Sequence, residues 1–145
     1  MLSNTSRYAI RALIYLAIHK NGGKKIGIKK IAEDLDIPSP FLGKILQTLA
    51  RQKVLNSTKG PNGGFSLSDK SLVLSLYDII EIIDGEDLFD RCLISNRSCS
   101  EREGNPCSMH NHYESIRQSL RSMFQGQTIQ QLADEFKASG GTIDL

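Results

Sequence analysis

The sequence predicts a mainly helical fold that contains one small β-hairpin, and three observations support this prediction. Two short amphipathic segments, residues 29–35 and 39–51, are separated only by a tight turn that ends in proline. The next segment alternates apolar and polar residues on both sides of the turn Gly60-Pro61-Asn62-Gly63-Gly64, which is typical of a hairpin. Residues 108–125 place apolar side chains at intervals of three and four. Together these features predict a winged helix-turn-helix followed by a long C-terminal helix.

Local signals place the individual elements of the N-terminal half. The first helix is expected over residues 8–20, where alanine and leucine recur at the spacing of one buried stripe, with N-cap candidates from Ser3 to Ser6 before it and a glycine pair after it. In the third helix, Ser39 is expected as the N-cap and Pro40 as the first helical residue. The two strands of the hairpin are expected at residues 54–59 and 65–68.

The C-terminal half contains two helices with clear start signals and one segment without periodicity. Ser75 is expected to cap a helix that ends at Asp84, with Asp78 at the third helical position of a capping box. Thr128 is expected to open a last short helix in which Gln131 completes a second capping box. We therefore divide the chain into a winged helix-turn-helix domain at residues 1–85, a cysteine-containing loop at 86–107, a long helix with a short packing helix at 108–138, and a loose tail at 139–145.

Length and composition are those of an ordinary soluble domain. The chain has 145 residues, of which 39% are hydrophobic and 23% charged, enough for one domain with a hydrophobic core. There is no apolar run of about 18 residues that could cross a membrane. The polar N-terminus lacks the apolar segment of a signal peptide. We therefore expect the protein to act in the cytoplasm.

Basic residues are concentrated in the N-terminal half. Residues 1–80 contain 12 Lys and Arg against 5 Asp and Glu, whereas residues 81–145 contain 6 against 11. A helix-turn-helix with a basic surface is typical of a protein that binds double-stranded DNA. The predicted helix that follows Ser39 is the recognition helix, the one expected to enter the major groove. In it, Gln47 can pair with adenine, Lys44 with guanine or phosphate, and Arg51 with phosphate. The expected DNA contacts are Ser39, Lys44, Gln47, Thr48, Arg51, Lys59, Asn62, Lys29 and Arg7, with Arg11 and Lys30 as further phosphate candidates.

The three cysteines lie close together in the sequence, at Cys92, Cys99 and Cys107, with His110 three residues beyond the last. Zinc sites usually contain cysteines paired two to four residues apart, and this segment has no such pair. The wide spacing favours a larger bound object, such as an iron–sulfur cluster. Cys107 precedes the long helix, whose N-terminus stabilises a thiolate, and His110 shares its face of that helix. The alternatives to His110 as a fourth ligand are His112, Glu101 and Glu103.

Three other interpretations stay open on the residues alone. The cysteine loop could hold a structural zinc ion, or no metal, and only brace the fold; the bound element distinguishes these cases. The cysteines could act directly in thiol redox chemistry, although the sequence has no C-x-x-C pair and no other catalytic constellation. The long helix could bind a protein partner in a chain that never contacts DNA, which weak salt dependence would reveal. We expect a DNA-binding protein and not an enzyme.

These motifs resemble those of one known family, the Rrf2 winged-helix regulators of bacteria, which include IscR and NsrR. The resemblance covers nearly the whole chain, and the wing and the cysteine loop together make it specific. Its motifs are SRYAIRALIYLA at residues 6–17, IAEDLDIPSPFLGKILQTLARQKVL at 31–55, GPNGGF at 60–65, LYDIIEIIDG at 76–85, and the three cysteines with His110.

The resemblance implies a homodimer that acts as a repressor or activator of transcription. In such a dimer the long helix crosses its partner, and two recognition helices enter successive major grooves of a pseudo-palindromic operator. The recognition helix has Gly43 where IscR has an acidic residue, so we expect a different operator. The residues expected at the dimer interface are Met109, Tyr113, Ile116, Leu120 and Met123.

The resemblance also implies an iron–sulfur cluster as the sensor of iron–sulfur status, redox state or nitric oxide. In IscR-like members, three cysteines and a histidine hold a two-iron cluster, and these roles would fall on Cys92, Cys99, Cys107 and His110. In NsrR-like members, a carboxylate of the partner's first helix is the fourth ligand and the cluster senses nitric oxide. Arg7 stands at that position here and cannot bind the metal. The cysteine spacings are longer than in the usual IscR pattern.

Overall fold

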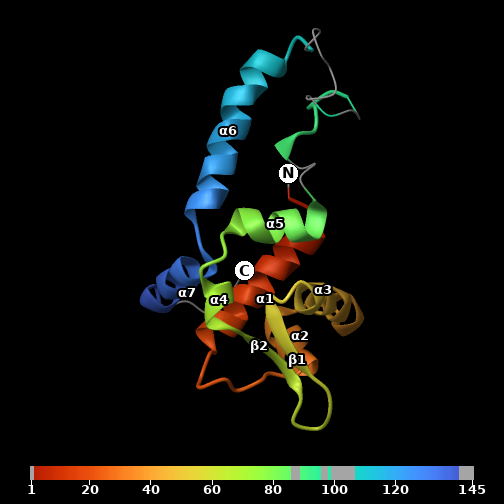
Figure 1. Ribbon diagram of the computed structural model, residues 1–145, viewed down its shortest axis with the longest axis vertical. Coiled ribbons are helices and arrows are strands. Elements are labelled where there is room, and N and C mark those ends of the chain that lie inside the picture. Colours follow the sequence, from red (N-terminus) through yellow and green to blue (C-terminus); the bar gives the residue numbers. More distant parts are fainter. Residues whose placement is uncertain (1, 86–88, 96–97, 99–106, 141–145) are drawn as a thin grey trace.

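The computed structural model describes residues 2–85, 89–95, 98 and 107–140, and Figure 1 shows a helical domain with a two-stranded hairpin and one projecting helix. The expected class, mainly helical with a small hairpin in a winged helix-turn-helix, is confirmed. Within the described residues the elements are α1 Asn4–Ile18, α2 Ile28–Leu35, α3 Ser39–Arg51, β1 Leu55–Thr58, β2 Gly64–Leu67, α4 Asp69–Leu72, α5 Leu76–Asp84, α6 His110–Gly126 and α7 Ile129–Ala138.

Helix α1 lies at the centre of the domain, in contact with α2, α3, β2, α5 and α7. It begins at Asn4, before the expected residue 8, because Ser3 caps it by accepting a hydrogen bond from the Ser6 backbone N–H at 3.0 Å. The hydroxyls of Ser3 and Ser6 also donate to Asp84 at 2.7 and 2.8 Å. This long-range contact stabilises the first turn of α1 and joins it to the end of α5.

The helix-turn-helix is formed by α2 and α3. The turn between them is tight because Asp36 adopts a left-handed conformation at φ 51° and directs Ile37 into the core. Helix α3 starts one residue earlier than expected: Ser39 is its first residue and Pro38 occupies the N-cap position. The carbonyl of Pro38 accepts hydrogen bonds from the N–H groups of Phe41 and Leu42, each at 3.0 Å, which begins the helix without a side-chain cap.

The wing is an antiparallel hairpin in which Leu55 pairs with Leu67 and Thr58 with Gly64. Ile26 lies beside β2 and forms an isolated antiparallel bridge with Phe65, with which its backbone exchanges hydrogen bonds of 3.0 and 2.9 Å. Gly64 has a φ of 146°, and a Cβ there would lie 2.4 Å from the Ile26 oxygen. A glycine is therefore required where the wing meets the segment before α2.

Helices α4, α5 and α7 complete the core. The short helix α4, which the sequence pattern did not indicate, is held by the Ser71 hydroxyl, which donates to the Val54 oxygen at 2.6 Å. The expected capping box of α5, formed by Ser75 and Asp78, is confirmed, and so is the capping box at the start of α7. Helix α7 packs against α1 with Ile129 fully buried, so the last helix belongs to the main core.

Helix α6 starts at His110, two residues later than expected, and extends away from the core (Figure 1). Its C-terminal half is held by a second apolar cluster, in which Ile80 and Phe89 pack with Phe124. The ring centroids of Phe89 and Phe124 are 5.9 Å apart. Backbone hydrogen bonds between residues 74–76 and 127–129 fix the lower end of α6 beside the start of α5. Among the described helices, none is long and apolar enough to span a membrane.

Candidate nucleic-acid interface and cysteine pair

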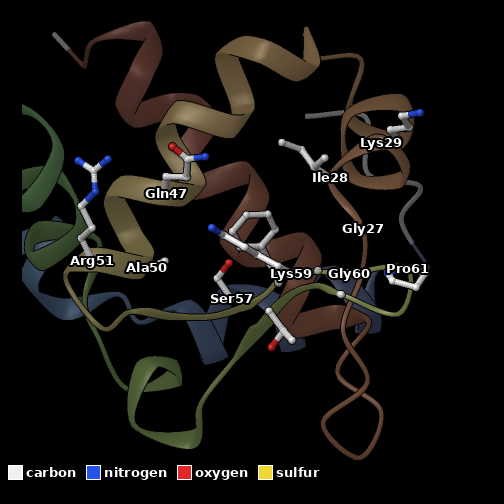
Figure 2. A pocket seen from close by; sticks show the side chains of 14 residues that line it. Gly27, Ile28, Lys29, Gln47, Ala50, Arg51, Ser57, Lys59, Gly60 and Pro61 are labelled. Atoms are coloured by element: carbon white, nitrogen blue, oxygen red, sulfur yellow. The ribbon is translucent and has the colours of Figure 1, made fainter.

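The recognition helix α3 and the wing face each other across an open groove (Figure 2). The first residues of α2 form a further wall of this groove. Basic and polar side chains from all three elements line it: Lys29 from α2, Gln47 and Arg51 from α3, and Ser57 and Lys59 from the hairpin. No carboxylate belongs to the residues that line the groove, so all of its charged lining side chains are cations.

Packing decides which side chains of α3 reach solvent. The apolar stripe that contains Leu42 and Leu46 is fully buried, and the opposite side exposes Lys44, Gln47 and Arg51. Ser39 and Thr48 are only half-buried, and the Thr48 hydroxyl donates to the backbone oxygen of Lys44 at 3.0 Å. This internal bond uses the only proton that Thr48 could donate to DNA.

The remaining expected contacts lie at the ends of the same surface. Arg7 is exposed on the first turns of α1, beside Tyr8, whose ring meets Phe41 of α3 edge-on at 5.6 Å between centroids. Asn62 is exposed in the turn of the wing but does not line the groove. The structure therefore brings Lys29, Gln47, Arg51 and Lys59 together and places the other expected contacts around them.

Two other cations that the sequence offered for phosphate are engaged within the fold. A guanidinium nitrogen of Arg11 donates to the Leu35 oxygen at 2.7 Å, and the Lys30 ammonium donates to Asp34 at 2.7 Å. The hydrogen bond from Lys30, followed by one from the Tyr15 hydroxyl at 2.6 Å, holds the pKa of Asp34 below its ordinary value. Arg11 and Tyr15 thus attach α1 to α2 and position the helix-turn-helix.

Sequence patterns did not predict that the segment before α2 supports the groove. Lys25 forms a hydrogen bond with the Thr58 hydroxyl of β1, which joins this segment to the wing. Ile28 lines the groove beside Gly43 of α3, where a Cβ would lie 3.1 Å from the Ile28 Cδ1 atom. The only signal was the apolar stretch of residues 26–28, too short to assign. Gly43 therefore permits a close approach of α2 and α3 at the groove.

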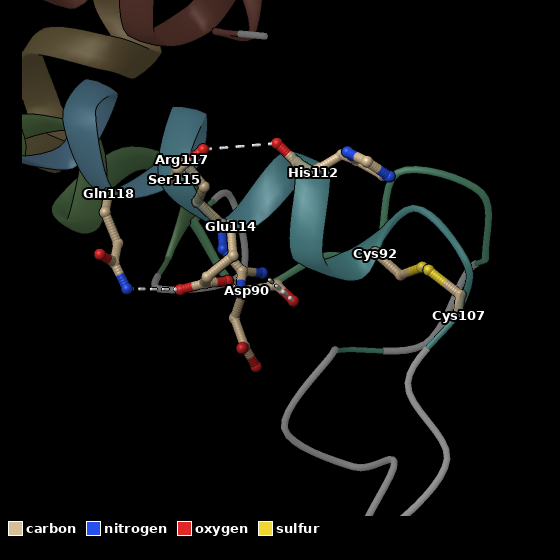
Figure 3. A network of polar contacts seen from close by, with 8 residues as sticks. All are labelled: Asp90, Cys92, Cys107, His112, Glu114, Ser115, Arg117 and Gln118. Carbon is tan, nitrogen blue, oxygen red and sulfur yellow. Dashed lines mark hydrogen bonds and ion pairs between the residues drawn. The ribbon is translucent and has the colours of Figure 1, made fainter.

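The structure brings Cys92 and Cys107 together. Their sulfur atoms are 3.6 Å apart and point toward each other in Figure 3, with Cys92 buried and Cys107 half-buried. His110 is the first residue of α6, and its backbone N–H donates to the Cys107 oxygen at 2.9 Å. Among the described residues, no group of three or more Cys, His, Asp or Glu side chains is arranged to hold a metal ion. The other candidate ligands Cys99, Glu101 and Glu103 lie outside the described residues.

The expected apolar face of α6 divides into two parts. Met109, Ile116 and Met123 are exposed by 38%, 62% and 53%, whereas Tyr113 and Leu120 are half-buried. Leu120 turns inward because it packs against the second apolar cluster. The exposed residues follow each other at a spacing of seven along one side of the helix and have no cover within the described chain.

A buried arginine on α6 was not anticipated from the sequence. Arg117 is 8% exposed, pairs with Glu114 one turn earlier, and donates to the Asp90 oxygen at 3.3 Å (Figure 3). Its guanidinium also lies 5.9 Å from the Tyr113 ring centroid. Arg117 therefore attaches the cysteine-containing segment to the middle of α6.

A recognition helix, a wing that carries a lysine and the groove between them define the class of winged helix-turn-helix proteins that bind DNA. The sequence profile of the Rrf2 family, described as iron-dependent transcriptional regulators, matches residues 2–135. The chain belongs to the Rrf2 family of transcriptional regulators. It is thus a member of a DNA-binding regulator family and not an enzyme, as the sequence predicted.

Individual relatives agree with this assignment. A protein of Aquifex aeolicus named as an HTH-type transcriptional regulator is 36% identical over 132 residues, which cover 91% of this chain and 90% of that protein. The structure of CymR, the global cysteine regulator of B. subtilis, has a TM-score of 0.76 at 20% identity and covers 93% of this chain and 97% of that one. The structure of T. potens IscR has a TM-score of 0.74 at 18% identity, with coverages of 97% and 91%. At these identities the two structures are evidence for the fold alone.

Proposed function

We propose that this regulator acts in the cytoplasm as a homodimer on a pseudo-palindromic operator and that a metal group on its cysteines controls DNA binding. The observation that carries the DNA-binding part is the groove that gathers Lys29, Gln47, Arg51 and Lys59 between α3 and the wing. Three cations with no carboxylate among the lining residues suit a phosphate backbone. The side-chain amide of Gln47 in the same groove can form hydrogen bonds with the edge of a base.

Each side chain of the groove has a role that its position suggests. Gln47, near the middle of the exposed side of α3, can form two hydrogen bonds with adenine in the major groove. Lys44 on the same side can donate to guanine or to phosphate. Arg51 and Lys29 lie at the edges, where phosphates are expected. Lys59 is carried by the wing and suits the minor groove or its backbone.

The outer residues extend this interface. Asn62 in the turn of the wing and Arg7 on α1 are exposed and can reach phosphates on either side of the recognition helix. Ser39 and Thr48 are half-buried on α3; the Ser39 hydroxyl suits a short-range contact to the DNA backbone, and the Thr48 methyl group suits contact with a thymine methyl group. The first test is footprinting of the purified protein on DNA selected from a random pool. A protected pseudo-palindrome with half-sites about one helical turn apart supports the proposal, and binding without sequence preference contradicts it.

The homodimer part of the proposal follows from the uncovered face of α6. Met109, Ile116 and Met123 form an apolar line on a helix that leaves the core. Such a line is stable in water when a second helix covers it. A second copy of α6 is the occupant that would also place two recognition helices on one duplex.

For the metal group, the residues present fit thiolate coordination in part. The sulfur atoms of Cys92 and Cys107 are 3.6 Å apart. A disulfide would hold them at about 2.05 Å, whereas two thiolates on one tetrahedral metal ion lie about 3.8 Å apart. The observed distance is close to the second value, so the two side chains can share one metal centre. With Cys99, and with His110 as the fourth ligand, they would hold the proposed two-iron cluster.

A bound iron–sulfur cluster would supply a centre that reacts with oxidants and with nitric oxide. The chain supplies the connection to the DNA-binding half. Cys92 follows Phe89, whose ring stacks on Tyr77 of α5 with centroids 5.0 Å apart. Cys107 lies at the start of α6. Ligation of both cysteines would therefore hold the first turn of α6 against the segment that leaves α5.

The cluster proposal is tested by anaerobic purification, an absorption spectrum, and assays of iron, acid-labile sulfide and zinc on the same sample. Visible charge-transfer bands with matched iron and sulfide support the cluster, and His110→Ala then tests the fourth ligand. Near-stoichiometric zinc in a colourless protein replaces the cluster with a structural ion. A colourless protein that stays metal-free after anaerobic reconstitution contradicts metal control. Footprints of loaded and metal-free protein on the same DNA show whether the group changes binding, and identical footprints refute the sensing part.

A further inference from the structure

We propose that Cys92 and Cys107 form an intrachain disulfide when the protein is free of metal and meets a disulfide oxidant, and that Cys99 remains the reduced thiol. The inference rests on geometry. The two sulfur atoms are in contact at 3.6 Å although the residues are 15 positions apart in the sequence. Figure 3 shows both thiol groups directed at each other. The two sulfur atoms need to approach by about 1.5 Å to reach the disulfide bond length of about 2.05 Å.

Both cysteines are held by folded elements outside the segment that separates them. Cys92 comes shortly after Phe89, which is 4% exposed and packs with Phe124 of α6. The neighbouring Asp90 oxygen accepts a hydrogen bond from Arg117. Cys107 is attached to α6 through the hydrogen bond to its oxygen at 2.9 Å. The contact between the sulfur atoms is therefore a property of the α5–α6 packing.

The different burial of the two thiols sets the order of the reaction. Cys107 is half-buried, so its thiolate can attack one sulfur of oxidised glutathione, which forms a mixed disulfide and releases one glutathione thiolate. Cys92 is 7% exposed and adjacent, so its thiolate attacks the Cys107 sulfur and releases the second glutathione. The protein loses two protons and two electrons, and the oxidised glutathione is reduced to two thiols.

Formation of the disulfide would prevent the protein from binding its metal group, and this step rests on the metal control proposed above. The disulfide removes the same two thiolates that we propose as metal ligands, and a metal requires them deprotonated and reduced. Oxidised protein would therefore not take up the group until a thiol reductant restores Cys92 and Cys107. The pairing itself does not depend on which group the cysteines bind.

The sequence allows an unambiguous test of the pairing, because trypsin separates the three cysteines. Cleavage after arginine releases Cys92 in residues 92–97, Cys99 in residues 98–102 and Cys107 in residues 103–117. Metal-free full-length protein is treated with oxidised glutathione, alkylated, digested without reductant and analysed by mass spectrometry. We expect the alkylatable thiols to fall from three to one. We also expect residues 92–97 linked to residues 103–117, with the alkyl group on Cys99, and recovery of all thiols after dithiothreitol.

Matched variants make the result decisive. Cys99→Ser is expected to form the same linked peptide in the same yield, whereas Cys92→Ser and Cys107→Ser are expected to form none. A linked peptide that contains residues 98–102, a link between two chains, or glutathione adducts alone would overturn the pairing. The iron, sulfide and zinc assays are made on separate, unoxidised samples. An absence of metal there would refute the proposed cofactor while leaving the disulfide result to stand or fall by itself.

Discussion

Replacement of the wing lysine tests the groove as a DNA interface. Lys59→Ala removes one cation from the groove of each chain and therefore two from the proposed dimer. Each phosphate contact contributes about 0.9 to the slope of log affinity against log salt concentration, so the slope of the dimer should fall by about 1.8. Between about 50 and 200 mM salt, a fourfold change, the wild type should lose about 12-fold more affinity than the variant.

Fluorescence anisotropy with a labelled duplex measures this effect. The duplex carries the site obtained by selection, and the affinity is determined at several salt concentrations for wild type and variant. Lys137→Ala is the matched control, because Lys137 is equally an exposed cation but lies on α7, which packs on the other side of α1 from the wing. The control slope should equal that of the wild type.

Two results would refute this reasoning. An unchanged slope for Lys59→Ala would mean that the wing does not contact phosphate. Equal slope changes in Lys59→Ala and Lys137→Ala would mean that only the overall charge of the protein matters. Circular dichroism of both variants should match the wild type, since neither side chain is part of the core.

Four other changes test separate parts of the structure. Gln47→Ala should reduce discrimination at one base position of each half-site by about 1–3 kcal/mol and leave the salt slope unchanged, as measured by competition with single-base operator variants. Asp84→Ala removes the acceptor of two side-chain hydrogen bonds, one of them from a fully buried hydroxyl, and should lower the free energy of unfolding in urea by about 2–4 kcal/mol. Ile116→Glu should convert the proposed dimer to a monomer in light scattering, whereas Gln125→Glu on the opposite side of α6 should not; a dimeric Ile116→Glu protein would reject this interface. The pKa of Asp34 is lowered in the folded protein, so the stabilisation from its carboxylate is present above the ordinary pKa of about 4 and is lost as the pH falls. Urea titrations should therefore show that the stability of the Asp34→Asn protein falls less over this acid range than that of the wild type.

Local sequence signals predicted the elements whose determinants lie within a few residues of each other. The capping boxes that begin α5 and α7, each formed by residues three positions apart, were found correctly. The buried stripe of α3 also follows from spacing alone, and so does the exposed side that carries Gln47 and Arg51. The turn of the wing was visible because Gly64 and its neighbours are typical of a hairpin turn.

Contacts between distant residues account for the features that were missed. The hydrogen bonds from Ser3 and Ser6 to Asp84, which join the first turn of α1 to the end of α5, connect residues 81 and 78 positions apart. The short helix α4 depends on the bond of Ser71 to Val54. Leu120 continues the heptad pattern of α6 but turns inward, because it packs against the second apolar cluster. A one-dimensional pattern has no access to such neighbours.

The sequence alone determined the winged helix-turn-helix and its family, because helix stripes, caps and turn residues are short-range properties. Only the tertiary structure decided which of those residues meet. It assembled Lys29, Gln47, Arg51 and Lys59 in one groove and attached Arg11 to the neighbouring helix. It also placed the sulfur atoms of Cys92 and Cys107 in contact, although these residues are 15 positions apart in the sequence. The physical reason is that burial of α1 and of the second apolar cluster fixes the orientation of every element, and side chains from separate elements come together only after that burial.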